Sequence, residues 1–378
     1  MKNIKYKHRD YCVKLQFTAK MFIILKVVTL LSKKITYYES NEVKCDLRLK
    51  EMLEDFPDLC KTYFRGIKPD TTSKTRLAYA NDLKIFFVFL INNNPSIKSM
   101  KEISTESLSM LTPLDIEEYM EYLRIYTYEG KKYINSDTGV RRKMFSLRSL
   151  FSYLYENKMI SVNPTVQVRI PKIKTKEIIR LEPNETAKLL DSIEYNTKLT
   201  GKKNIYQEKN MIRNLAIVTT MLGTGIRVSE CVGLNIDDID FDNDCLMVTR
   251  KGGNEDFVYF GDEVRDALMD YIEVRKGIVA MKEHKDALFL SSRKIRISVR
   301  SVEALVKEYS KSCIAIKNIT PHKLRSTYGT TLYQETGDIY MVADVLGHKD
   351  VNTTRKHYAA ISDERKRNAK DKVRLRRD

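Results

Sequence analysis

The sequence lacks several features that would each point to a particular class of protein. Its six cysteines are scattered, with no C-x-x-C pair and no histidine-rich neighbourhood, so we expect reduced thiols and no metal site. No G-x-x-x-x-G-K-S/T segment occurs, which argues against a nucleoside triphosphate site. The sequence therefore predicts a folded protein that works without a cofactor.

Long hydrophobic runs are also missing. The apolar stretch at residues 21–31 contains Lys26 and is too short to cross a bilayer, which takes about 20 apolar residues. It starts too far into the chain for a signal peptide, and it lacks the small-residue cleavage site that a signal peptide has. We expect a buried helix or strand there, no membrane partner and a cytoplasmic location. Residues 1–20 are basic without an apolar period, and are interpreted either as an arm or as a start-codon artefact.

Positive charge is present in clear excess. The 378 residues include 67 Lys and Arg but only 50 Asp and Glu, which gives a formal net charge of +17 and a pI near 9.4. This balance favours a polyanionic partner, nucleic acid before membrane, although charge alone also fits a ribosomal protein or a lipid-surface protein. The length and the 42% of hydrophobic residues suffice for two folded domains with a short appendage.

The first half of the chain is typical of a helical bundle. Helical signals cover residues 71–90, 116–123 and 138–155, the last read as two helices or as one. Residues 46–56, within the N-terminal extension, also have helical apolar spacing. Short connections between such helices are typical of a compact bundle. We therefore expect an N-terminal extension at 1–66, a helical domain at 67–168, and an exposed basic linker at 169–178.

The second half, residues 179–378, predicts a mainly helical domain with one small antiparallel sheet. Helical spacing covers four stretches, which run from Leu181 to Leu190, Met211 to Met221, Asp262 to Lys276 and Ser298 to Ser310. A strand around Ile239–Phe241 precedes a hairpin within Cys245–Phe260, whose turn is Gly252-Gly253-Asn254. The tail, residues 363–378, is charged throughout and reads as a solvated helix.

Three segments of this second half carry candidate chemistry. In Met221–Glu230, two glycines precede Arg227 where a helix begins, so its guanidinium would lie at a positive helix end with Glu230 as partner. Lys251 lies at the tip of the hairpin, where it could enter a nucleic-acid groove, protonate a leaving oxygen or simply add surface charge. Each feature alone is also typical of an ordinary solvated surface.

The third segment is Ile319–Tyr328. His322 and Arg325 are three residues apart, on one face of a helix that starts just after Pro321. A guanidinium matches two phosphate oxygens, and an imidazole can bind a third or move a proton near neutral pH. The pair therefore favours a phosphodiester, although such a spacing by itself is common on helix surfaces.

Taken together, the order Arg227, Lys251, His322, Arg325, His348 and Tyr358 resembles the catalytic set of the tyrosine recombinases, the phage-integrase and Xer family. The segments around Arg227, His322 and His348 also read like the motifs of that family. The resemblance spans about residues 70 to 362. Two departures are visible: Ser326 stands where many members have His, and Tyr358 lies one residue further from His348 than is common.

The resemblance implies a fold and an activity. The fold would be mainly α with a small antiparallel β-sheet, comprising an N-terminal helical-bundle (SAM-like) core-binding domain and a C-terminal mixed α/β catalytic domain. The chain would be a site-specific recombinase that cuts and rejoins double-stranded DNA through a 3′-phosphotyrosine, in integration, excision or Xer-type resolution. It would assemble as a tetramer on paired sites, with or without a second recombinase, in the cytoplasm and on the nucleoid.

The resemblance also assigns roles to the residues. Tyr358 would attack the phosphodiester, and Arg227 and Arg325 would bind its non-bridging oxygens. His322 would accept the phenol proton, Lys251 would protonate the leaving oxygen, and His348 would add a phosphate hydrogen bond. Glu230 would hold Arg227. No metal is implied.

Basic residues of the first half are candidates for DNA phosphate contacts. They are Lys74, Arg76, Arg141, Arg142, Lys143 and Arg148. An ordinary solvated face fits the same pattern, and the family resemblance favours DNA. Two other functions stay open at this point: a type IB-like topoisomerase, and a non-catalytic DNA-binding regulator with the same fold.

Overall fold

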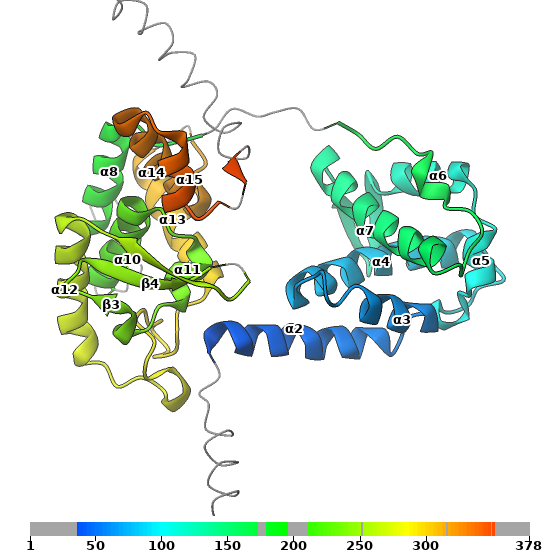
Figure 1. Cartoon of the computed structure of the whole chain (residues 1–378), viewed down its shortest axis with the longest axis horizontal. Coiled ribbons are helices and arrows are strands. Elements are labelled where there is room, and N and C mark those ends of the chain that lie inside the picture. The colour runs from blue at the N-terminus through cyan, green and yellow to red at the C-terminus, as the bar shows by residue number, and fades with distance from the viewer. Residues whose placement is uncertain are drawn as a thin grey trace, which may run out of the picture. The chain divides into compact units, whose positions relative to one another are not determined.

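The computed structural model describes residues 36–172, 179–195, 210–250, 252–314, 317–348 and 350–351. The chain divides into two compact units, Met1–Ile173 and Lys174–Asp378 (Figure 1). The division falls within the predicted linker at 169–178. No helix of the described ranges is both long enough and apolar enough to span a membrane.

The first unit is a helical bundle with one small hairpin. Its elements are α2 (Tyr37–Leu53), α3 (Asp58–Gly66), α4 (Ser73–Asn93), η1 (Met100–Glu102), α5 (Thr105–Ser109), α6 (Pro113–Tyr122), β1 (Ile125–Tyr128), β2 (Lys131–Ile134), α7 (Asp137–Glu156) and η2 (Pro164–Val166). Hydroxyl groups of Thr36, Thr72 and Thr112 cap the first turns of α2, α4 and α6. The helix α4 packs against α2 and α7.

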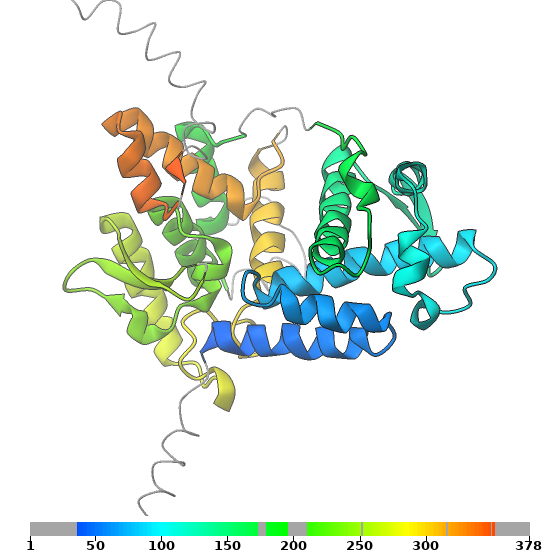
Figure 2. The ribbon, with the colours of Figure 1, turned by 45° about the vertical axis from the view of Figure 1, so that its right-hand side comes forward.

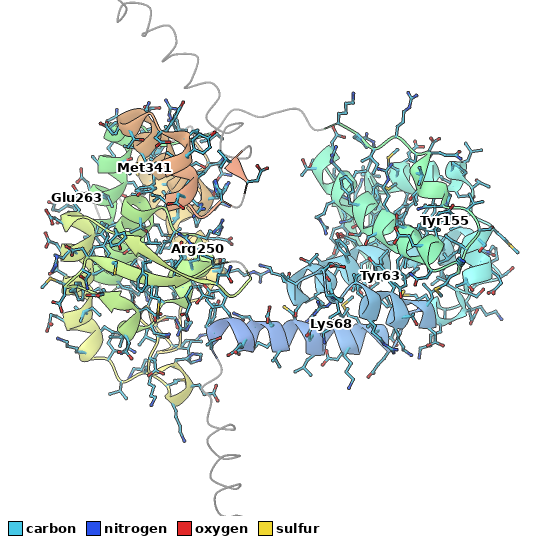
Figure 3. The ribbon with its side chains drawn as sticks, viewed as in Figure 1. Tyr63, Lys68, Tyr155, Arg250, Glu263 and Met341 are labelled. Atoms are coloured by element: carbon cyan, nitrogen blue, oxygen red, sulfur yellow. The ribbon has the colours of Figure 1, made fainter. Side chains whose placement is uncertain are left out.

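Aromatic rings fill the core of this unit. Phe86 of α4 meets Tyr119 of α6 edge-on at a centroid distance of 5.0 Å, and Phe151 of α7 at 6.2 Å. Tyr63 of α3, labelled in Figure 3, is fully buried. Its hydroxyl donates a hydrogen bond to Ser149 Oγ at 2.8 Å. Because α2 and α3 contribute to the same core, the described part of the expected extension at 1–66 does not stand apart from the bundle.

The hairpin β1–β2 was not expected from the sequence. Glu129 and Gly130 form its turn with φ of 51° and 71°, and Tyr126 pairs with Tyr133 across the strands. Their rings stack at 5.2 Å. The signal was a short run of Tyr, Ile and Thr on either side of Glu-Gly, too brief to separate from the neighbouring helices.

The second unit is helical around a three-stranded antiparallel sheet. Its elements are α8 (Pro183–Glu194), α10 (Met211–Thr224), α11 (Val228–Gly233), η3 (Ile236–Asp238), β3 (Ile239–Asp240), β4 (Cys245–Thr249), β5 (Glu255–Tyr259), α12 (Asp262–Lys276), η4 (Lys282–His284), α13 (Val299–Cys313), α14 (Pro321–Thr336) and α15 (Ile339–Val345). The sheet order is β3-β4-β5, and α10 packs against α8, α12 and α14 (Figure 2). The predicted fold class, mainly helical with a small antiparallel sheet, is confirmed.

A buried carboxylate joins two helices of the first unit. Asp82 of α4 is 2% exposed and accepts hydrogen bonds from Arg142, from Lys143 Nζ at 3.4 Å and from Ser146 Oγ at 2.9 Å, all on α7. Burial lowers the pKa of Lys143, while the charge of Asp82 raises it. On balance the pKa of Lys143 lies below its ordinary value, and the carboxylate of Asp82 offsets part of the effect of burial.

We predict that Asp82→Ala destabilises the first unit by about 3–5 kcal/mol, because it leaves the buried ammonium of Lys143 without a counter-charge. Arg142→Ala is the matched control: its side chain is 52% exposed, and the loss should be about 1 kcal/mol. Hydrogen exchange of the α4 and α7 amides in the intact protein measures the stability loss in each variant. Equal stability losses in the two variants would contradict the role of Asp82 as counter-charge to Lys143.

Candidate active site

The candidate site begins where α10 ends. Gly225 takes a left-handed conformation, φ 65°, and its amide caps the helix on Met221 O. A Cβ at this position would lie 2.4 Å from Cδ1 of Tyr328 on α14, so only glycine permits this close approach. The chain then turns, and Arg227 becomes the N-cap residue of α11.

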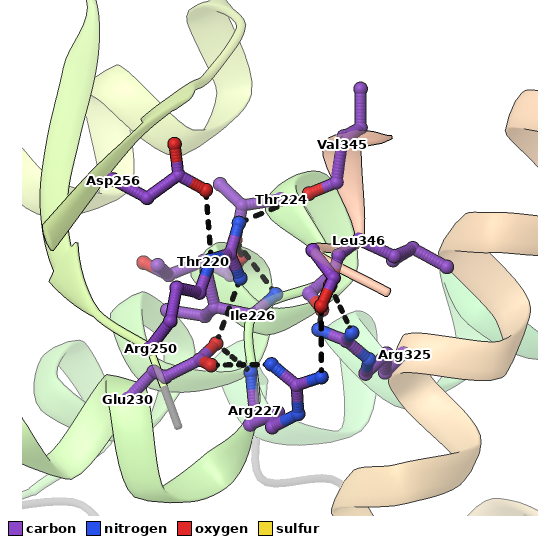
Figure 4. A network of polar contacts seen from close by, with 12 residues as sticks. Thr220, Thr224, Ile226, Arg227, Glu230, Arg250, Asp256, Arg325, Val345 and Leu346 are labelled. Atoms are coloured by element: carbon purple, nitrogen blue, oxygen red, sulfur yellow. Dashed lines mark hydrogen bonds and ion pairs between the residues drawn. The ribbon is translucent and has the colours of Figure 1, made fainter. Parts of the chain in front are cut away.

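Glu230 is the buried acceptor of the site. It is 2% exposed and accepts the Arg227 backbone N–H at 2.8 Å and Arg227 Nη1 at 2.7 Å. Its other contact is with Arg250, whose Nη1 lies 3.1 Å from Oε2 (Figure 4). The predicted contact of Glu230 with Arg227 is present, and the carboxylate also holds a second guanidinium.

Arg250 follows β4 directly, and sequence reasoning missed it. It is 9% exposed, and besides Glu230 it donates from Nε to Asp256 Oδ2 at 2.9 Å and from Nη2 to Val345 O at 3.1 Å. The only signal in the sequence was a second basic residue beside Lys251. Two of its partners, Glu230 and Val345, lie 20 and 95 residues away along the chain, so no local pattern could have identified these contacts.

Arg325 lies on α14 and is 4% exposed. Its Nη1 donates to Gly225 O at 2.6 Å, and its Nη2 donates to Leu346 O. Arg227 Nη2 reaches Gly347 O at 3.4 Å. Three consecutive carbonyls, those of residues 345–347, therefore accept hydrogen bonds from three different arginines, each from a different part of the second unit (Figure 4).

The two histidines lie beside this arrangement. His322 is exposed in the first turn of α14, one turn before the buried Arg325. His348 is half-buried and follows Gly347 directly, with its backbone N–H donated to Ala343 O at 2.9 Å. The structure thus places Arg227, Arg325 and His348 around one turn of the chain. The predicted residues Lys251 and Tyr358 lie outside the described residues.

Tyr328 of α14 lies within the described residues and packs at the end of α10. It is half-buried against Gly225, and burial raises the pKa of its phenol. A raised pKa makes the phenolate, which is the nucleophilic form, harder to reach. The observed contact of the Tyr328 ring is with Gly225, which is a packing contact between α14 and the end of α10.

Two of the predicted DNA contacts need correction. Arg76 is 4% exposed and donates to Asp46 Oδ1 at 2.9 Å and Thr71 O at 2.5 Å, so it braces the bundle. Lys143 is 8% exposed and paired with Asp82. The hydrogen bonds of both side chains go to partners within the bundle, so the structure gives them a role in packing the first unit.

The other four predicted contacts differ in exposure. Lys74 is exposed, and Arg142 is half-exposed although paired with Asp82. Arg148 donates to the carbonyls of Thr165 and Val168, and burial lowers its pKa. Arg141 donates to Pro171 O at 3.2 Å and lies 5.0 Å from the Phe145 ring centroid.

Comparison with known proteins gives the following matches. The sequence model of the phage integrase family matches residues 180–365. Tyrosine recombinase XerC of Caldanaerobacter subterraneus subsp. tengcongensis is 33% identical over 366 residues, which cover 94% of each chain. Tyrosine recombinase XerS of Streptococcus mutans is 31% identical over 354 residues, covering 86% of this chain and 98% of that protein.

Solved structures share the fold. The XerH site-specific recombinase in a post-cleavage complex with a palindromic difH substrate aligns with a TM-score of 0.60 at 19% identity, covering 90% of this chain and 91% of that chain. A lambda integrase dimer bound to a COC′ core site aligns with a TM-score of 0.55 at 18% identity, covering 78% and 95%. With the sequence relatives covered nearly end to end, the conclusion is that this chain belongs to the phage integrase family of tyrosine recombinases.

Proposed function

We propose that this chain is a site-specific recombinase that cuts and rejoins double-stranded DNA through a 3′-phosphotyrosine, with Tyr358 as nucleophile. The observation that carries the proposal is the cluster of Arg227, Arg250 and Arg325 around residues 345–347. This turn leads directly to His348, and Tyr358 follows ten residues after His348 in the sequence. A phosphodiester is the natural ligand for such a concentration of guanidinium charge.

The chemical step is a transesterification. The Tyr358 hydroxyl oxygen forms a bond to the scissile phosphorus, and the bond from phosphorus to the 5′-oxygen breaks. The phenol proton passes to His322, and the leaving 5′-oxygen takes a proton from Lys251. Religation is the reverse reaction, with the 5′-hydroxyl as nucleophile. Because each step exchanges one phosphate ester for another, no external energy source is required.

The arginines supply the electrostatics. A phenol has an unperturbed pKa near ~10, so Tyr358 needs positive charge close to the reacting phosphate. Arg227 and Arg325 stabilise the charge that develops on the non-bridging oxygens, and His348 adds a hydrogen bond. Glu230 keeps Arg227 in place through two hydrogen bonds. The roles of Tyr358 and Lys251 rest on the family's motif order alone.

The first unit is proposed as a DNA-binding domain that acts together with the catalytic unit. Lys74 and Arg142, the more accessible of the predicted basic residues, are its proposed phosphate contacts. A tetramer on two paired sites is the proposed assembly, since exchange needs four strand cuts, and the cytoplasmic nucleoid is the proposed location.

The first test uses Tyr358→Phe, which removes one oxygen and little volume. We predict that this variant binds DNA as the natural protein does but forms no covalent adduct on a duplex nicked near the cleavage site. Denaturing gels detect the adduct, and peptide mass analysis locates it. Tyr328→Phe is the control and should keep the adduct. An adduct formed by Tyr358→Phe would disprove the assignment of the nucleophile.

The same substrate also separates the possible activities. Joining of strands from two different duplexes identifies a recombinase. Relaxation of a supercoiled plasmid without exchange would instead identify a topoisomerase, and absence of any adduct with the natural protein would identify a regulator.

The second test uses Arg227→Lys, which keeps the charge and loses the two-pronged donor. We predict a cleavage rate lower by about 10²–10³-fold, comparable to loss of one oxyanion donor, with little change in DNA affinity. Arg265→Lys is a matched control, because its side chain is similarly exposed, 31% against 34%, and similarly paired, with Asp244 at 2.8 Å. Single-turnover cleavage measures both, and equal rates in the two variants would place Arg227 outside the site.

A further inference from the structure

The geometry points to Arg250 as a positioning residue for the reaction: it fixes Arg227 through Glu230, and it fixes the turn before His348 through the carbonyl of Val345. This inference rests on the proposed function. It concerns a residue outside the six assigned from the motif order.

The donors of Arg250 point into the protein. Its side chain is 10% exposed, whereas that of Arg227 is 34% exposed. Its three nitrogens each donate to a separate partner, Asp256, Glu230 and the Val345 carbonyl. All three nitrogens of this guanidinium have protein partners, so it is not available to bind phosphate. It connects β5 with two segments next to proposed catalytic groups, α11 after Arg227 and the turn before His348.

The first connection passes through Glu230. This buried carboxylate accepts Arg227 through Oε1 and Arg250 through Oε2. Without Arg250, one oxygen of a buried anion loses its cationic partner, so the carboxylate will rotate or recruit water. Either change shifts the guanidinium of Arg227, since Glu230 also holds its backbone N–H.

The second connection passes through the turn at residues 345–347. Gly347 has a φ of 61°, and a Cβ there would lie 2.9 Å from Arg250 Nε. The turn is thus built against the guanidinium itself. Because Arg227 and Arg325 bind the next two carbonyls, Arg250 completes a fixed frame for the segment that leads to His348.

The experiment compares Arg250→Met with Arg275→Met in the full-length protein. Arg275 is the matched control, because it is 4% exposed and donates to the carbonyls of Ala287, Ile278 and Lys285, away from the site. The readouts are the folded fraction, the DNA affinity with its salt dependence, and the single-turnover cleavage rate at saturating protein.

For Arg250→Met we expect the cleavage rate to fall on the order of 10²-fold, while DNA affinity and its salt dependence stay unchanged. A displacement of catalytic groups by about 1 Å produces a loss of this size. Arg250→Lys, which can still pair with Glu230, should recover part of the rate. Arg275→Met should cleave at the natural rate for its folded fraction.

Three results would overturn the inference. If folded Arg250→Met cleaves at the natural rate, the role of Arg250 is structural only. If affinity falls and the log–log salt slope becomes shallower by about 0.9, Arg250 binds a phosphate directly. If Arg250→Met lowers the rate equally in the natural and the Arg227→Lys backgrounds, the two arginines act independently. A natural protein that forms no adduct would instead refute the proposed function.

Discussion

The candidate site depends on one buried carboxylate between two guanidiniums. Glu230 brings Arg227 and Arg250 together although their like charges repel, and this fixes the end of β4 against the start of α11. Removing one partner of a buried ion pair typically lowers the free energy of unfolding by about 3–5 kcal/mol, because the remaining charge is buried without a counter-charge. The carboxylate therefore makes it possible to concentrate positive charge where we propose that a phosphodiester binds.

Two glycines allow the segments that carry the site to approach one another. Gly225 lets α14 approach the end of α10, and Gly347 lets the turn after α15 lie against Arg250. Both have φ above 60°, a conformation that side chains disfavour. Because the carbonyls of Gly225 and residues 345–347 take up arginine donors, the backbone itself forms part of the electrostatic framework.

The sequence predicted what depends on short spacing. Apolar periodicity located most long helices, paired glycines located the β4–β5 turn, and a three-residue interval linked Arg227 to Glu230. It did not identify Arg250, whose partner Glu230 lies 20 residues earlier and whose partner Val345 lies 95 residues later. For the same reason Lys143 was read as a surface charge: its partner Asp82 is 61 residues away, and burial depends on that long-range packing.

Arg227, Arg250 and Arg325 differ in exposure, and their proposed roles differ accordingly. Arg250 and Arg325 are buried and donate to a carboxylate or to backbone carbonyls, so they form a fixed frame. Arg227 differs, because its bond to Gly347 O is 3.4 Å long, near the limit of a hydrogen bond, and its side chain is the most accessible of the three. Exchanging that weak bond for a phosphate oxygen costs little, while the bond to Glu230 keeps the guanidinium aimed. Arg227 can thus exchange Gly347 O for another acceptor while Glu230 holds it. Glu230 is itself fixed, because its Oε2 accepts a hydrogen bond from Arg250.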